Sequence, residues 1–126
     1  MQIVHTTESS QAIGPYSQAL VVDGWLYTSG AVGLTKDNEI VGPGVVEQTE
    51  QTFANLKAVL AAAGCTLQDV VKATVYLADM GEFQDMNGVY AAAMDGHCPA
   101  RSCVEVQRLP LDLRVEIDLV VKLPGA

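Results

Sequence analysis

Two apolar segments near the N-terminus, residues 19–22 and 25–29, are separated only by Asp23-Gly24. This residue pair supplies the positive φ angles that a type I′ turn needs. The sequence therefore predicts an antiparallel β-hairpin here. Whatever else the chain forms must be compatible with a β-sheet that contains this hairpin.

Helical periodicity marks two longer segments. Between residues 46 and 63, apolar side chains recur at spacings of seven, three, four and three, and Gly64 follows as a C-terminal stop. The second helix is predicted to begin at Asp79, with Glu82 at the N3 position of a capping box, and to end at Gly96. Both segments are amphipathic, so each is predicted to place one face on a sheet.

Three further segments alternate with a period of two and are predicted as strands. They are residues 71–77, with Val71 on the apolar face; 100–107, with Val104 on the apolar face and Arg101 on the other; and 114–121, with Glu116 opposite its apolar face. Residues 2–5 are a candidate edge strand. This order predicts an α+β fold with a mixed sheet and two helices on one face.

The sheet face away from the helices is predicted to be uncovered by this chain. It would carry a mixture too apolar and aromatic for plain solvent exposure: Trp25, Tyr27, Tyr76, Arg101, Cys103 and Glu116. We therefore predict that a partner subunit covers this face.

Composition limits the function classes. The chain has 126 residues, which predicts one domain spanning 1–126, and a net charge of −8. This charge argues against nucleic acid and anionic membrane as main partners. The longest apolar stretch, residues 58–63, is far too short to cross a bilayer, and no signal peptide is evident, so we expect a cytoplasmic protein.

Arg101 and Glu116 are the most informative charged residues. They lie on late strands joined by a short connection that permits antiparallel pairing, so both are predicted to converge on one pocket. The alternative is a half-exposed cross-strand salt bridge worth about 0.2–1 kcal/mol.

Each of the other candidate residues also has a purely structural interpretation. Tyr16 follows Gly14-Pro15, a turn that could present its hydroxyl at a rim or serve only as a stiff surface turn. Ser29-Gly30 ends a strand, where glycine permits close approach of a ligand, although many strands end this way. Asn87 and Tyr90 share one side of a helix, where an amide beside a core tyrosine is more often structural.

The cysteines do not indicate a metal or a nucleophile. Cys65, Cys98 and Cys103 form no C-x-x-C pair and are expected to be free thiols. His97, Cys98 and Cys103 lack a fourth ligand for zinc, and periodicity places no base beside Cys103. No phosphate-binding loop or dinucleotide fingerprint occurs, so no metal or cofactor is predicted.

Taken together, the motifs resemble the Rid/YjgF family over essentially the whole chain. The P-A-R-S motif, followed at the right distance by V-E-I, is the specific part. The matching segments, in order, are Gly14-Pro15-Tyr16-Ser17-Gln18, Ser29-Gly30, Glu47-Gln48-Thr49, Asn55-Leu56, Asn87-Gly88-Val89-Tyr90, Pro99-Ala100-Arg101-Ser102-Cys103-Val104 and Val115-Glu116-Ile117.

The resemblance implies a chorismate-mutase-like α+β fold and a homotrimer with a central sheet barrel and clefts between subunits. It implies hydrolysis of 2-imino acids, the reactive products of pyridoxal-phosphate enzymes, to 2-oxo acids and ammonia. Arg101 would bind the substrate carboxylate, Glu116 would position or deprotonate water, and Tyr16 would assist proton movement. Ser29, Gly30, Asn87 and Cys103 would line the cleft.

Three departures from the family pattern bear on substrate side-chain preference. Ala31 replaces a frequent Gln, Met94 replaces a common aromatic residue, and Leu111-Asp112 replaces Lys-Gly. Two other functions remain open: a non-catalytic trimer acting as a small-ligand sensor or chaperone-like protein, and an endoribonuclease that inhibits translation. The acidic charge and the few aromatic residues disfavour the endoribonuclease.

Overall fold

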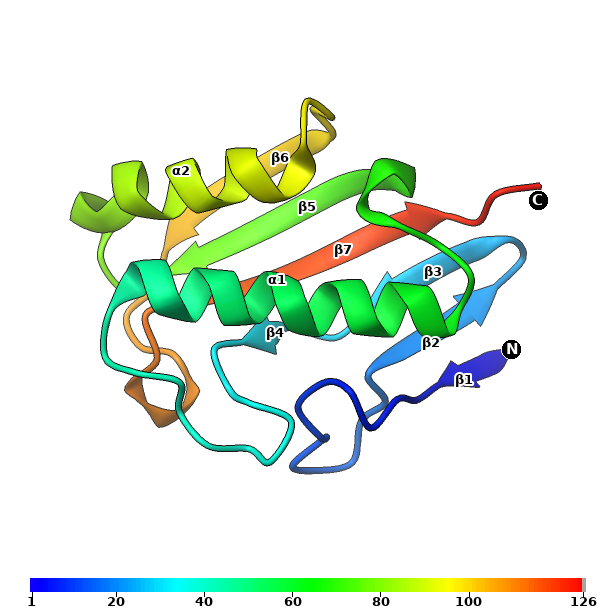
Figure 1. Cartoon of the computed structure of the whole chain (residues 1–126), viewed down its shortest axis with the longest axis horizontal. Helices are drawn as coiled ribbons and strands as arrows, with labels where there is room; N and C mark the ends of the chain where they lie inside the picture. Colours follow the sequence, from blue (N-terminus) through cyan, green and yellow to red (C-terminus); the bar gives the residue numbers. More distant parts are fainter. Residues whose placement is uncertain (126) are drawn as a thin grey trace.

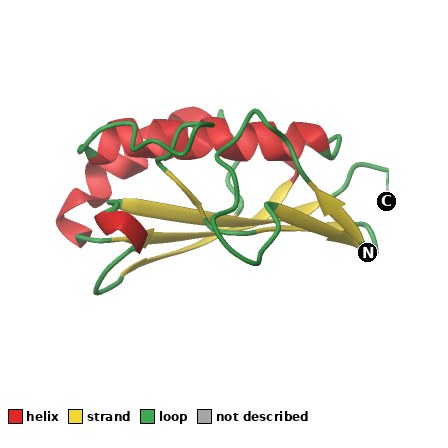
Figure 2. Cartoon of the chain, turned by 90° about the horizontal axis from the view of Figure 1, so that it is seen from below, coloured by secondary structure: helices red, strands yellow, loops and turns green. Residues whose placement is uncertain are grey.

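A computed structural model describes residues 1–125, which form one mixed sheet with two helices packed on the same face (Figures 1 and 2). The helices are α1 (Val45–Ala62) and α2 (Phe83–Met94). The strands are β1 (Gln2–Val4), β2 (Ala19–Val22), β3 (Trp25–Thr28), β4 (Ala31–Val32), β5 (Val70–Leu77), β6 (Ala100–Glu105) and β7 (Val115–Lys122). The sheet order is β1-β2-β3-β7-β5-β6, with β4 also paired to β7. The predicted α+β fold is confirmed.

The predicted hairpin is present as β2 and β3. Asp23 and Gly24 adopt φ angles of 51° and 82°, which match the type I′ requirement. β1 pairs with β2 at the edge of the sheet, so the candidate edge strand at the N-terminus is also confirmed.

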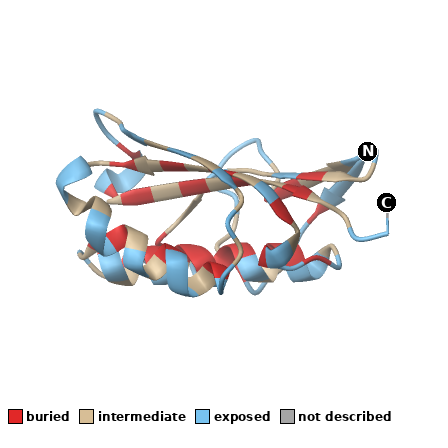
Figure 3. Ribbon diagram, turned by 90° about the horizontal axis from the view of Figure 1, so that it is seen from above, coloured by how far each residue is buried: buried red, intermediate tan, exposed pale blue. Residues whose placement is uncertain are grey.

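The core lies between the helices and the sheet, where the buried residues gather (Figure 3). From α1, Phe53, Leu56 and Leu60 are buried; from β7, Ile117 and Leu119 are buried. Fully burying each such side chain stabilises the fold by about 1.5–3 kcal/mol. Both predicted helices therefore exist, with α1 ending one residue before the predicted position and Gly64 following at φ 78°.

The predicted pairing of the last two strands is wrong, because β5 lies between them. β5 is parallel to β6 and antiparallel to β7. The connection from β6 to β7 crosses the end of β5, where Val106 donates its N–H to Leu77 O at 2.9 Å and Ala78 donates to Arg114 O at 3.1 Å. These bonds hold the connection across β5 rather than in a hairpin.

Two local predictions also need correction. Val71 is 43% exposed rather than buried, because the register of β5 shifts between Val70 and Lys72 and Val70 takes the core position. Asp79 caps a short 3₁₀ turn, Met80–Glu82, by accepting the Gly81 N–H. Glu82 is paired with Arg114 instead of closing a capping box.

Within residues 1–125, neither helix combines the length and apolar character needed to cross a membrane.

Candidate functional site

The candidate site residues fall into two groups on opposite faces of the sheet. Arg101 and Cys103 pair with Ala73 and Val75 of β5, both of which are fully buried beneath the helices. Glu116 pairs with Tyr76, the intervening residue, and therefore points to the other face. Arg101 and Glu116 therefore share no pocket within this chain, and the prediction that both lie on the uncovered face is wrong for Arg101. The alternative of a direct salt bridge between them is equally excluded by this placement.

The uncovered face therefore differs from the predicted one. Tyr76 and Glu116 lie on it, and so do Trp25 and Tyr27, which flank the buried Leu26 on β3. Arg101 and Cys103 lie on the helix side instead.

The sequence assigned Arg101 to the wrong face of the sheet. The period-two pattern of β6 divides its residues into two sets but does not show which set faces the helices. Val104 is 42% exposed, while the Arg101 stem passes beneath α2 and its guanidinium lies over aromatic rings. A long arginine side chain can cover apolar surface in this way while its charged end stays polar.

The first half of the site, which we call the guanidinium half, consists of Arg101 with its α2 neighbours and Cys103. Arg101 Nη1 donates to Asn87 Oδ1 at 2.7 Å. The guanidinium carbon lies 4.6 Å from the Tyr90 ring centroid and 5.5 Å from that of Phe83. The aromatic rings therefore pack against the guanidinium group, and Asn87 fixes one of its edges through the hydrogen bond. Asn87 is the one side-chain partner of Arg101 within residues 1–125, so further N–H groups can bind a carboxylate.

Cys103 lies partly buried on the same face. Burial raises the pKa of its thiol above the ordinary value, and the nearby Arg101 charge only partly opposes this. A protonated thiol is a poor nucleophile, so Cys103 is suited to lining the site. All three cysteines are free, as predicted.

An open cavity of about 540 Å³ lies beside Arg101, between α2 and the start of β6. Asn87, Tyr90 and Arg101 form its polar part. Its other walls come from small or flexible residues: Ala91, Met94, Gly96, His97, Cys98 and Pro99.

The second half of the site, which we call the carboxylate half, lies at the junction of β4 and β7. A depression of about 320 Å³ is lined by Tyr16, Ser29, Gly30, Pro110 and Glu116. Three predicted residues, Tyr16, Ser29 and Gly30, are thus brought together with Glu116 on one face.

Gly30 is required by the position of the Glu116 side chain. A Cβ at Gly30 would lie 2.6 Å from Glu116 Cδ and 2.8 Å from its Cγ. The sequence predicted the approach of a ligand at this glycine, and within this chain the group that lies close to it is the Glu116 carboxylate.

Tyr16 and Ser29 are held by local bonds. Ser29 Oγ donates to Ser17 O at 2.6 Å, and the Tyr16 hydroxyl accepts the Ile13 N–H at 3.2 Å. Because Ser29 uses its proton within the chain, its side chain positions the turn. Tyr16 is half-exposed, and its hydroxyl accepts the Ile13 bond without using its own proton.

The environment of Glu116 changes its acidity. Burial raises the pKa of this carboxyl above its ordinary value, and the nearby Asp118 charge adds to the shift. A carboxylate with a raised pKa is a better proton acceptor near neutral pH.

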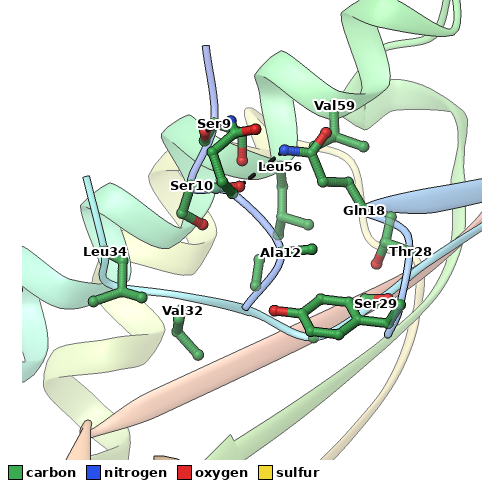
Figure 4. Close-up of a pocket in the computed structure, with 14 residues that line it drawn as sticks. Ser9, Ser10, Ala12, Gln18, Thr28, Ser29, Val32, Leu34, Leu56 and Val59 are labelled. Carbon is green, nitrogen blue, oxygen red and sulfur yellow. Dashed lines mark hydrogen bonds between the residues drawn. The ribbon is translucent and has the colours of Figure 1, made fainter. Parts of the chain in front are cut away.

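Gln18 is a residue that the sequence prediction missed. Its amide accepts the Thr6 N–H at 2.8 Å and donates to Ser10 O at 2.9 Å, which holds the 6–11 loop above the Ser29 turn. Ser9, Ser10, Gln18 and Ser29 form the polar part of a small cavity beside the carboxylate half, and apolar residues such as Val32 and Leu56 form the rest (Figure 4). The G-P-Y-S-Q motif contains this glutamine and was the signal that could have identified it.

Within residues 1–125, no group of three or more His, Cys, Asp or Glu side chains is placed to hold a metal ion. His97 Nε2 lies 2.7 Å from Val70 O. This ring nitrogen, one of the side-chain atoms considered above as a zinc ligand, is therefore engaged with the backbone.

The fold is that of one class of protein, with one helical layer over a mixed sheet, and the candidate site residues lie on both faces of that sheet. Residues 6–123 match the family described as Endoribonuclease L-PSP. A RutC family protein of Synechocystis is 46% identical, covering 98% of each chain, and the 2-iminobutanoate/2-iminopropanoate deaminase of Mus musculus is 45% identical, covering 94% of this chain and 89% of that protein.

A solved structure has the same fold. E. coli TdcF with bound serine superimposes with a TM-score of 0.92 at 35% identity, covering 97% of this chain and 98% of that one. The chain belongs to the Rid/YjgF family.

Proposed function

We propose that the protein is a 2-iminobutanoate/2-iminopropanoate deaminase, which hydrolyses a 2-imino acid to a 2-oxo acid and ammonia. The observation that supports this most directly is the guanidinium half: an arginine fixed by Asn87 and Tyr90 with N–H groups left for a carboxylate. A planar guanidinium binds a carboxylate through two parallel charge-assisted bonds. The Mus musculus relative carries the name of this activity.

In the proposed reaction, Arg101 binds the substrate carboxylate and Glu116 accepts a proton from a water molecule. The water oxygen forms a bond to the imine carbon, and the C=N pair of electrons moves to nitrogen. Glu116 passes the proton it took from water to that nitrogen, assisted by the Tyr16 hydroxyl, which gives a carbinolamine. The carbinolamine hydroxyl then gives its proton to the nitrogen by the same route. The C–N bond breaks, ammonia leaves, and the C=O bond of the 2-oxo acid forms. Because an imine carbon is already electrophilic, orientation and a placed base are sufficient, and no cofactor is required.

The two halves lie on opposite faces of one sheet, so a single chain cannot place both on one substrate. We propose a homotrimer in which each cleft combines the guanidinium half of one chain with the carboxylate half of its neighbour. The uncovered sheet face supports this assembly, since Tyr27 is 46% exposed on it and Val104 is also partly exposed there. A subunit interface would bury both.

A non-catalytic role in binding a small amino-acid-like ligand is the second candidate. It is favoured by the TdcF structure, which has bound serine. Turnover separates the two functions, because a sensor binds the ligand without releasing ammonia.

Complementation between two inactive variants tests the proposal. Arg101→Ala and Glu116→Gln are purified separately, mixed, unfolded and refolded together. Every mixed trimer contains one cleft with both native residues, so equal mixing restores about one quarter of wild-type imine hydrolysis. Arg101→Lys replaces the alanine variant if the latter does not refold.

The control refolds each variant with itself, which restores nothing. Mixed trimers are verified by native mass spectrometry. Mixed trimers without recovered turnover would contradict the divided cleft, and a wild-type protein that binds 2-oxo acids without hydrolysing imines would support the sensor instead.

A further inference from the structure

The turn before β7 contains two consecutive residues in a backbone conformation that suits glycine best. Leu111 has a φ of 58° and Asp112 a φ of 55°, both in the left-handed region. Aspartate tolerates this region, whereas leucine rarely adopts it. Such strain persists where the surrounding structure fixes it, and it is concentrated at functional sites. The position of Leu111 therefore needs a reason.

The residues around Leu111 fix this turn. Leu109 and Leu113, one on each side, are buried and anchor its two ends. Arg108 binds Asp112 through two hydrogen bonds, Nε to Oδ1 at 2.6 Å and Nη2 to Oδ2 at 3.1 Å. The Leu111 side chain is 59% exposed, so it contributes little to holding the turn. The turn instead presents this apolar side chain at the surface.

Leu111 lines an apolar cavity of about 310 Å³ beside the carboxylate half. Four residues line both this cavity and the depression at Glu116: Tyr16, Gly30, Pro110 and Glu116 itself. The other walls of the cavity are aliphatic: Ile13, Val32, Leu34, Leu111 and Leu113. The cavity therefore adjoins the place where the proposed base acts.

We infer that Leu111 is a specificity-determining residue that favours 2-imino acids whose aliphatic side chain is longer than ethyl, such as the imine derived from leucine. This inference rests on the proposed function, since it takes Glu116 as the base that activates water. The reacting carbon of a 2-imino acid carries the side chain directly. With that carbon beside Glu116, the side chain enters the adjoining cavity and packs against Leu111.

The chemistry of the walls favours an apolar side chain. Glu116 is the one charged residue among the described residues that line the cavity, so an anionic side chain would be repelled and a polar one would lose bonds to water. Aliphatic carbons gain free energy when they leave water for such a surface. Each carbon beyond ethyl adds contact with the aliphatic walls.

Truncation of Leu111 tests this. Leu111→Ala retains the Cβ and removes the rest of the side chain. kcat/KM is measured for the imines that an amino-acid oxidase generates in place from leucine and from 2-aminobutanoate. The ratio of leucine-derived to 2-aminobutanoate-derived imine hydrolysis should fall by about tenfold, the lower end of the range for one methylene in an apolar pocket. A general change in the cleft affects both imines and cancels in this ratio.

Two further variants are compared with Leu111→Ala. Leu111→Met restores a flexible apolar side chain of similar volume and should keep the ratio within about twofold of wild type. Val46→Ala shortens another exposed aliphatic side chain, on α1 in the helical layer, and should leave the ratio unchanged. If Leu111→Ala does not fold, Leu111→Gly replaces it, because glycine accepts a φ of 58° without strain.

An unchanged ratio in the truncated variant would overturn the inference. An equal loss with both imines, together with a weakened oligomer, would also overturn it, because Leu111 would then pack against a partner subunit. If wild type hydrolyses neither imine, the proposed function fails, and calorimetry with 4-methyl-2-oxopentanoate and 2-oxobutanoate decides the role of Leu111. A loss of affinity confined to the longer acid would support that role, and any other result would contradict it.

Discussion

Replacing Gly30 with alanine should displace the Glu116 carboxylate while leaving the carboxylate itself in place, so it tests how far activity depends on the position of this group. The added Cβ would lie 2.6 Å from Glu116 Cδ. An unstrained carbon–carbon contact needs about 3.5 Å, so the carboxylate must move by about 0.9 Å. Gly30 does not need a positive φ, so the backbone accepts alanine, and the strain falls on the Glu116 side chain.

A displacement of this size is expected to cost about 100-fold in imine hydrolysis, the loss associated with a 1 Å misplacement of a reacting group. The free energy of unfolding should fall by at most about 1–3 kcal/mol, the usual cost of overpacking. The assay couples ammonia release to a dehydratase that supplies the imine, with calorimetry of a stable 2-oxo acid in parallel. Binding should change little, since Arg101 is untouched.

Gly88→Ala is the matched control, because a Cβ at Gly88 meets nothing within 4 Å and the residue lies in α2. It should preserve activity and stabilise the helix by up to about 1 kcal/mol. The double variant Gly30→Ala/Glu116→Gln decides the reasoning. If Gly30 acts through Glu116, the alanine costs nothing further once the carboxylate is gone. An equal loss in both backgrounds would refute the argument and assign Gly30 a direct role.

Two further predictions concern the charged groups themselves. Arg101→Ala should weaken binding of a stable 2-oxo acid by about 1.5–3 kcal/mol, and Arg101→Lys should recover little because it lacks the planar fork; recovery by lysine, seen by calorimetry, would show that charge alone suffices. Glu116 must be ionised to accept a proton, and its raised pKa means that activity is lost as the pH falls through a value above the ordinary glutamate pKa of about 4.3. Asp118→Asn removes one cause of the raised Glu116 pKa, so the fall of kcat/KM on the acid side should move to lower pH. If the fall stays at the same pH, it belongs to the titration of a group other than Glu116.

Local patterns in the sequence were sufficient for most of the fold. Asp23-Gly24 has one good conformation in a tight hairpin, and the structure adopts it. The apolar periodicity that predicts α1 is followed by Gly64, which adopts a positive φ. Such features are decided by residues close in the chain, so they can be read without knowing the tertiary structure.

Long-range features could not be read in the same way. The position of β5 between β6 and β7 depends on backbone bonds at Leu77 and Ala78, which no side-chain pattern records. The shift at Val71 is similar, because two adjacent valines give no sign of which one occupies the core. The two-residue strand β4 is too short to produce a period.

The same limit explains the error over Arg101. An arginine in an alternating strand suggests an outward face, and only the rings of Phe83 and Tyr90 from another element make the inward face favourable. Once Arg101 is placed on the inward face, it is separated from Glu116 by the intervening strand β5, and the two side chains point to opposite faces of the sheet.

This separation gives Arg101 and Glu116 different environments. Aromatic faces and an amide fix the guanidinium, while partial burial and Asp118 raise the pKa of the carboxyl. Placed together in one chain, the two charges would neutralise one another in a salt bridge, and the carboxyl pKa would fall rather than rise. Under the proposed assembly, each group keeps the partners that its own chain gives it, and a substrate carboxylate on the guanidinium of one chain lies in the same cleft as Glu116 of the neighbouring chain.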